Sequence, residues 1–142
     1  MSKLEESLNL TPPVHKAKEG RFIEVGNNIR MPESFPRFLK TFNQQLNINT
    51  INLGEVSGNH YHKFKQEGIL IVNGKARVLI ENPETKEKYE TLADAGYHFT
   101  LVSGIAHAIM TATENPLILI EATNMGFDKD NEQKDIYLYK LI

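Results

Sequence analysis

The sequence contains no cysteine and no tryptophan, and its runs of aliphatic residues are short. Without cysteine, disulfide bonds and thiolate metal sites are excluded. An aliphatic run such as Leu117–Ile120 is far below the roughly 20 residues of a membrane-spanning helix. The opening residues, MSKLEESLNLTPP, carry two glutamates and lack the apolar core of a signal peptide. We therefore expect a cytoplasmic protein with no membrane partner.

Basic residues are not in excess either. The 16 lysines and arginines are outnumbered by 18 acidic residues, and the formal net charge is -2. Because nucleic-acid affinity comes largely from cations that neutralise phosphates, we expect no nucleic-acid partner. The length of 142 residues and the hydrophobic share of 40% suit one globular domain. We predict an N-terminal arm over residues 1–20 and a single β-barrel domain over residues 21–142.

Short strand patterns fill most of the chain, and no long stretch has the periodicity of a helix. The predicted strands are Arg21–Val25, Arg37–Phe42, Ile48–Leu53, Gln66–Val72, Lys75–Glu81, Lys88–Leu92, His98–Val102, Ala106–Thr113, Leu117–Ala122 and Ile136–Leu141. Short helices are expected at most within the first ten residues and near Asp130–Asp135. Many short strands with frequent turns predict an all-β sandwich or barrel.

Turn residues separate these strands. Asn73-Gly74 stands between two apolar runs, which is a strong signal for a two-residue β-hairpin. The polar stretch over residues 82–87 predicts a longer loop, and Glu114-Asn115-Pro116 predicts another turn. We therefore predict a hairpin that joins the strands on either side of Asn73-Gly74.

Histidines and a glutamate fall at positions that alternation places on buried strand faces. His60 and His62 are two residues apart, so on an extended strand they share a face. Glu67 shares a face with Ile69 and Ile71 in an apolar strand. A carboxylate buried there needs a cation or hydrogen bonds, because an unpaired buried charge costs several kcal/mol. This spacing predicts that the three polar side chains point into the protein.

His107 adds a fourth side chain of the same kind, since it shares a face with Ile109 at the start of another apolar strand. Three imidazoles and one carboxylate form a good ligand set for a divalent ion such as zinc, iron, manganese or nickel. We predict that His60, His62, Glu67 and His107 bind one such ion. His15 and His98 are interpreted as ordinary polar residues, and His98 is out of phase with the apolar face of its strand.

The order of these residues resembles the cupin superfamily. Its first motif, Gly-x5-His-x-His-x4-Glu-x6-Gly, is matched in full by Gly54, His60, His62, Glu67 and Gly74. This resemblance implies a double-stranded β-helix, or jelly roll, of the RmlC-like type. It also implies that the His and Glu side chains of the motif are metal ligands, and that the protein forms a homodimer through added edge strands.

The second cupin motif, Gly-x5-Pro-x-Gly-x2-His-x3-Asn, is matched by Gly96, Gly104 and His107. Val102 stands in place of the proline and Thr111 in place of the asparagine. Neither position is a metal ligand in the family, so the departures leave the predicted ligand set intact. The missing proline removes a conformational restraint from the loop before His107.

Further side chains are candidates for the surroundings of the metal. Thr111 shares its face with His107, so it is a candidate for the cavity wall or a plain β-branched strand residue. Lys65 is a candidate substrate contact by analogy with the family, although a solvated turn lysine is the simpler interpretation. Tyr61 and Arg77 are expected to point away from the metal. Tyr97 remains a candidate neighbour of the pocket.

A narrower similarity links the chain to small cupins of surface-polysaccharide and nucleotide-sugar metabolism. It rests on His60-x-His62-x-x-Lys65-x-Glu67, the polar stretch ENPETKEKYE and the terminal IYLYKLI. The leading hypothesis is therefore a metal-dependent isomerase or epimerase acting on a nucleotide-sugar or another carbohydrate-like substrate. Two alternatives remain open at this point: an iron-dependent dioxygenase of a small organic molecule, and a non-catalytic small-ligand-binding cupin.

Overall fold

The computed structural model describes residues 2–7, 15–18, 20–27, 44–125 and 135–142. Its elements are α1 (Lys3–Ser7), β1 (His15–Lys18), β2 (Arg21–Asn27), β3 (Gln45–Ile51), β4 (Ser57–Tyr61), β5 (Glu67–Asn73), β6 (Lys75–Glu81), β7 (Lys88–Asp94), β8 (His98–Leu101), β9 (Ala106–Thr111), β10 (Leu117–Thr123) and β11 (Tyr137–Leu138). The predicted strand Arg37–Phe42 and most of the helix expected near Asp130–Asp135 lie outside the described residues.

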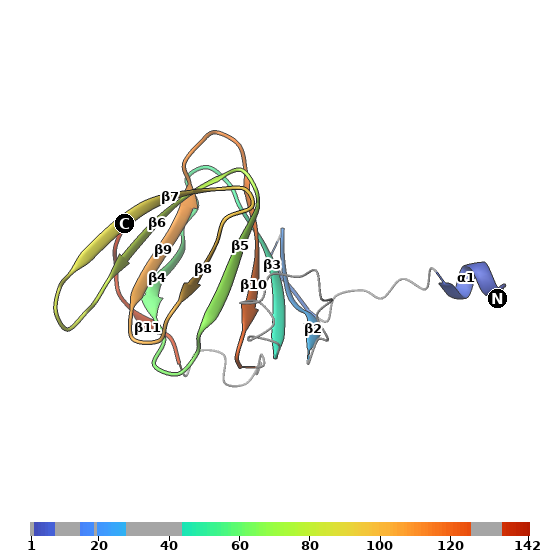
Figure 1. Ribbon diagram of the computed structural model, residues 1–142, viewed down its shortest axis with the longest axis horizontal. Coiled ribbons are helices and arrows are strands. Elements are labelled where there is room, and N and C mark those ends of the chain that lie inside the picture. The colour runs from blue at the N-terminus through green and yellow to red at the C-terminus, as the bar shows by residue number, and fades with distance from the viewer. Residues whose placement is uncertain (1, 8–14, 19, 28–43, 126–134) are drawn as a thin grey trace.

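The strands form two antiparallel sheets that lie against each other (Figure 1). Sheet A has the order β1-β2-β3-β10-β5-β8, and sheet B has the order β11-β4-β9-β6-β7. Neighbours in each sheet come from distant parts of the sequence, as when β10 pairs with both β3 and β5. The predicted all-β architecture is confirmed, and its crossing connections are those of a jelly roll.

Alternating side chains of both sheets form the core between them. In β3 and in the first part of β10, every second residue is buried, which is the pattern of a strand with one face on a core, whereas most of β9 is buried on both faces. The buried apolar set is Ile51, Ile69, Ile71, Ala76, Val78, Ala93, Leu101, Ile109, Leu117 and Leu119. Each large aliphatic side chain in it contributes about 1.5–3 kcal/mol through removal of apolar surface from water.

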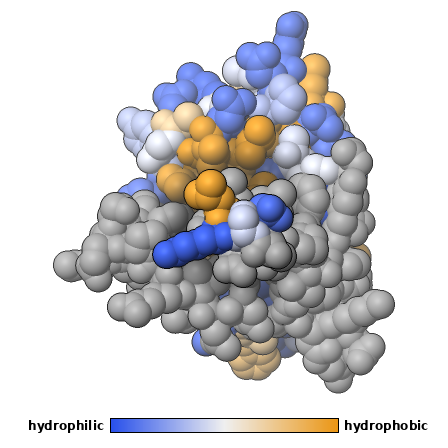
Figure 2. Space-filling model, turned by 90° about the vertical axis from the view of Figure 1, so that its right-hand side faces the viewer, coloured by the Kyte–Doolittle hydropathy of each residue, from blue (hydrophilic) through white to orange (hydrophobic). Residues whose placement is uncertain are grey.

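Sheet A is apolar on its outward positions as well. Ile48 pairs with Ile120, which in turn pairs with Leu70, and all three side chains are partly buried. Figure 2 views the molecule from the side of β2 and β3, and apolar side chains gather in the upper part of that face. The outer face of this sheet is therefore less polar than the face of a sheet that is exposed to water.

The prediction of a hairpin at Asn73-Gly74 is wrong. β5 ends at Asn73 and β6 begins at Lys75, yet β5 belongs to sheet A and β6 to sheet B. Gly74 has φ of +89°, and a Cβ there would lie 2.9 Å from the carbonyl oxygen of Pro116. The two residues therefore carry the chain from one sheet to the other, and the local turn signal cannot distinguish that bend from a hairpin.

Strands β1 and β4 were not among the predicted strands. β4 reads SGNHY, and glycine and asparagine are depleted in strands, so its own propensity is low. Pairing with β9 and β11 holds it extended. The terminal strand predicted over Ile136–Leu141 is reduced to β11, and the division into an arm and one domain stays a prediction. No helix in the described part of the chain is long and apolar enough to cross a membrane.

Candidate metal centre

Three histidines converge between the sheets. His60 lies on β4, His62 follows that strand, and His107 lies on β9, where it is the cross-strand partner of His60. One ligand nitrogen from each ring lies within 4.8 Å of the other two. The ring centroid of His60 is 4.8 Å from those of both His62 and His107. These three imidazoles form a group that can hold one metal ion.

Gly58 makes this convergence possible. It has φ of +110°, and a Cβ at this position would lie 2.5 Å from the carbonyl oxygen of His107. The register of β4 against β9 shifts between Gly58 and His60, so Asn59 is an extra residue in a β-bulge. The bulge brings His60 opposite His107, and no sequence motif indicated it.

The two ring nitrogens of His62 have different surroundings. Its Nδ1 lies 2.8 Å from the main-chain carbonyl oxygen of Asp135, and since a carbonyl only accepts, Nδ1 carries the proton. The Nε2 is then the lone-pair nitrogen. This Nε2 and Nδ1 of His107 are buried and have no hydrogen-bond partner among the described residues. A buried lone pair without a partner, on a ring that the carbonyl of Asp135 holds in place, fits a divalent cation.

Glu67 lies beside the histidines. Its Oε1 is 3.1 Å from Nε2 of His62, although the geometry there is not that of a hydrogen bond, and 3.8 Å from Nζ of Lys65. Burial by itself raises the pKa of this carboxyl, but its charged and polar neighbours, Lys65 first among them, lower it below its usual range. Glu67 is therefore an anion at neutral pH, and its charge faces the three imidazoles.

His60 and His107 are neutral at neutral pH. Burial, together with the nearby His107 and His62, lowers the pKa of His60 to about 4. Burial also lowers the pKa of His107. A neutral imidazole is the form that binds metal, so protons do not compete for the rings of His60 and His107 near pH 7.

The histidines and Glu67 line a cavity of about 250 Å³ between the sheets. Lys65 is part of its wall, and two further charged side chains, Arg21 and Glu121, line it as well. Sequence reasoning missed both. Glu121 shares its face with Leu119 and Leu117 in the apolar run of β10, and the same argument that singled out Glu67 applies to it.

Glu121 belongs to a short chain of buried polar side chains. The Nε2 of Gln45 donates to Oδ1 of Asn47 at 2.7 Å, and Nδ2 of Asn47 donates to Oε2 of Glu121 at 3.3 Å. All three are at most 5% exposed. Burial raises the pKa of Glu121, and the charge of Glu67 raises it further. The cavity therefore contains two carboxyls whose pKa values move in opposite directions.

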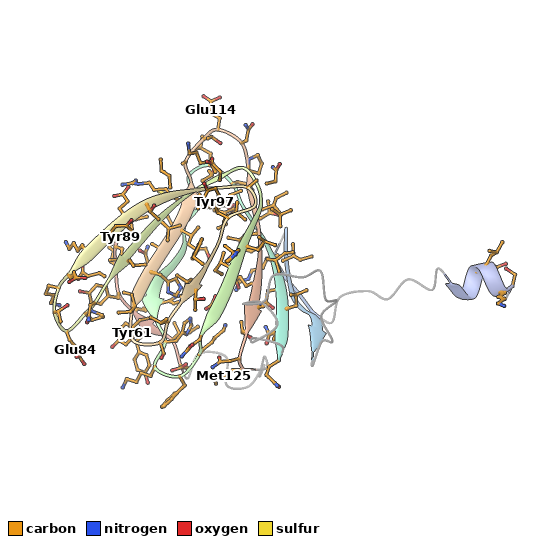
Figure 3. All side chains as sticks on the ribbon, in the orientation of Figure 1. Tyr61, Glu84, Tyr89, Tyr97, Glu114 and Met125 are labelled. Atoms are coloured by element: carbon orange, nitrogen blue, oxygen red, sulfur yellow. The ribbon has the colours of Figure 1, made fainter. Side chains whose placement is uncertain are left out.

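The other candidates lie apart from the histidines. Thr111 is buried, but its hydroxyl donates to the carbonyl of Asn115, and it is not in the cavity wall. Tyr61 stacks on Tyr137 at 5.2 Å, and Arg77 pairs with Glu90. Figure 3 shows Tyr61 and Tyr97 at opposite ends of the barrel, with Tyr97 at the upper end.

The remaining two histidines are not part of the group. His98 is exposed on β8, in agreement with its phase in the sequence. The side chain of His15 lies outside the described residues.

Comparison with known proteins finds a matching family and a relative that is named for a UDP-linked sugar. Residues 33–137 match the model of the family called Polysaccharide biosynthesis C-terminal domain. A UDP-2-acetamido-2,6-beta-L-arabino-hexul-4-ose reductase of Pseudomonas aeruginosa is 28% identical over 130 residues, which are 89% of this chain and 32% of the reductase. The chain thus spans about a third of the length of that relative.

Solved structures give the same picture of the fold. The capsular polysaccharide assembling protein CapF of Staphylococcus aureus superposes with a TM-score of 0.63 at 25% identity, over 68% of this chain and 28% of CapF. The oxalate decarboxylase of Bacillus subtilis, a protein with Mn(II) centers, superposes with a TM-score of 0.54 at 18% identity, over 59% of this chain and 22% of the decarboxylase. The predicted cupin fold is confirmed, and the chain belongs to the family of polysaccharide biosynthesis C-terminal domains.

Proposed function

We propose that this chain is a metal-dependent isomerase or epimerase that acts on a keto-sugar nucleotide. The observation that carries the proposal is the group of three imidazoles, with the Glu67 anion beside them, in the wall of one cavity. We assign His60, His62, His107 and Glu67 as the ligands of one divalent ion. When bound, such an ion supplies a Lewis acid that stabilises negative charge developing on a carbonyl oxygen.

The relatives support the class of substrate. The name of the Pseudomonas reductase describes a UDP-linked sugar with a keto group at carbon 4. Hydride transfer is not supported for this chain, because its sequence contains no G-x-G-x-x-G motif for a dinucleotide. A carbonyl also acidifies the C–H bonds on the neighbouring carbons, which makes proton transfer at those carbons the chemistry that remains.

Glu121 is the candidate proton acceptor. It lines the cavity with the histidines, lies outside the proposed ligand set, and has a pKa above its usual range because it is buried. In the proposed step, a C–H bond next to the keto group breaks, the proton passes to Glu121, and the electron pair moves toward the keto oxygen. Return of a proton to the carbon completes the epimerisation or isomerisation, and no oxidant or reductant is needed.

The test is incorporation of solvent deuterium. Metal-loaded protein is incubated in D2O with a panel of keto-sugar nucleotides, and deuterium next to the keto group is measured by NMR and mass spectrometry. We expect incorporation with at least one substrate, and a loss of about 100-fold or more in Glu121→Gln. The His98→Ala variant is the control and should behave as the wild type. Metal-loaded wild-type protein that exchanges no proton of any panel member would refute the proposed reaction.

A further inference from the structure

The cavity is too small for a whole nucleotide-sugar. Its volume of about 250 Å³ is below the roughly 300–1,000 Å³ of pockets that enclose drug-sized ligands. One sugar ring fits this space, whereas the diphosphate, the ribose and the base of a nucleotide-sugar are together larger than the sugar itself. If the proposed function holds, the nucleotide must therefore lie outside the cavity, on the surface around its mouth.

The loop between β4 and β5 forms part of the cavity wall. His62 and Lys65 both line the cavity, and Phe64 lies between them in the sequence. The ring of Phe64 is 70% exposed. Lysines precede and follow it, so an exposed aromatic ring stands between two cations within reach of the cavity.

Hydrogen bonds hold this loop in place. The carboxylate of Asp135 accepts from the main-chain N–H groups of Lys63, Phe64 and Lys65, at distances from 2.9 to 3.3 Å. The side chain of Asn124 adds a second anchor, because its Oδ1 accepts from the N–H of Gln66 at 2.8 Å. The exposure of the Phe64 ring is therefore a feature of a fixed backbone.

The charges beside Phe64 suit a diphosphate. Lys65 is partly buried, and its Nζ lies 3.8 Å from Oε1 of Glu67, so its charge sits at the inner rim of the cavity. Lys63 is exposed, and its Nζ lies 4.5 Å from the ring centroid of Tyr137. Because Lys65 lines the cavity and Phe64 does not, we expect a nucleotide-sugar that extends out of the cavity along this loop to meet Lys65 before the ring of Phe64.

We propose that Phe64 is the platform on which the base of the nucleotide-sugar stacks, with the diphosphate beside Lys65. This inference rests on the proposed function for its class of substrate. Stacking on an aromatic ring tolerates any base, because every base has a π face. The loop therefore recognises that a nucleotide is present, and the identity of the sugar is read inside the cavity.

The test is equilibrium binding of UDP to metal-loaded, full-length protein, measured by calorimetry. Phe64→Ala should weaken binding about 10-fold, which is within the range expected for loss of one base–aromatic stack. Phe64→Trp should restore the affinity. Tyr97→Ala is the matched control, because Tyr97 is a 64% exposed aromatic residue at the far end of the barrel, and it should bind UDP as the wild type does. Metal content should be equal in all four proteins.

Several results would overturn the assignment. Wild-type protein that does not bind UDP, or a Phe64→Ala variant with unchanged affinity, removes the platform. The platform is also removed if Tyr97→Ala loses as much UDP affinity as Phe64→Ala. It is removed as well if Phe64→Ala binds UDP normally but sediments differently, because the ring would then lie against a second copy of the chain. UDP binding does not depend on turnover. If deuterium exchange is absent but UDP binding depends on Phe64, only the proposed reaction is refuted. If exchange occurs but UDP binding does not depend on Phe64, only the platform is refuted.

Discussion

At the scale of single residues, the candidate centre depends on which nitrogen of each imidazole faces the cavity. The carbonyl of Asp135 fixes the proton of His62 on Nδ1 and leaves Nε2 free for a cation. Alternation along the strands predicted the burial of His62, Glu67 and His107, because the two-residue period is a local property. The tautomer was beyond sequence reasoning, since Asp135 is 73 residues away from His62.

Loss of one proposed ligand should lower metal affinity sharply. Removal of a residue that only hydrogen-bonds to a metal ligand typically lowers metal affinity about 10–100-fold, so His62→Ala and Glu67→Gln should each lower it about 100-fold or more. The measurement is elemental analysis of protein purified without a metal-affinity tag, followed by competition with a chelator. His98→Ala should keep the wild-type metal content. Full occupancy in Glu67→Gln would show that the carboxylate is not a ligand.

At the scale of elements, the bulge in β4 is the feature that aligns the histidines. The side chain of Asn59 in this bulge also holds the C-terminal residues, because its Oδ1 accepts from the N–H groups of Leu141 and Ile142. The bulge thus links the metal centre to the end of the chain. The bulge accompanies the close approach of β4 to β9 at Gly58, and this approach is seen only once the two strands are paired.

Gly58→Ala should therefore disturb both stability and the metal centre. The positive φ and the contact with the carbonyl of His107 should together cost about 1–3 kcal/mol of the free energy of unfolding. Metal affinity should fall as well, because β4 must move away from β9. Gly54→Ala is the control: Gly54 has φ of +86°, but no atom lies within 4 Å of its Cβ position. Urea unfolding and metal titration of both variants separate the effect of the positive φ from that of the contact with the carbonyl of His107. Equal metal affinities in Gly58→Ala and Gly54→Ala would contradict this account.

At the scale of the whole molecule, two sheets enclose an apolar core that continues into a polar cavity. Five titratable side chains, His60, His62, Glu67, His107 and Glu121, therefore lie around one cavity. The expected homodimer stays a prediction. The outward apolar positions of sheet A, such as Ile48 and Ile120, are consistent with it.

The metal-free protein should lose stability in mild acid. The folded-state pKa of His60, about 4, lies below its unfolded value near 6.5, so the unfolded chain binds more protons between these pH values. The contribution of His60 is complete above pH 6.5 and is lost as the pH falls toward 4. His107 acts in the same direction, and the lowered pKa of Glu67 extends the loss to lower pH. Urea midpoints measured from pH 7 to pH 4 check this, and a midpoint that rises on acidification would contradict it.

The sequence alone determined the all-β class, the phase of the buried polar residues and the resemblance to cupins, because strand alternation and motif spacing are local. Only the tertiary structure decided that Asn73-Gly74 crosses between sheets and that Gly58 forms the bulge beside His107. It also decided that Glu121 shares the cavity of the histidines. The physical reason is the same in each case: pairing between strands far apart in the chain sets which backbone and side-chain atoms meet, and no local pattern contains that information.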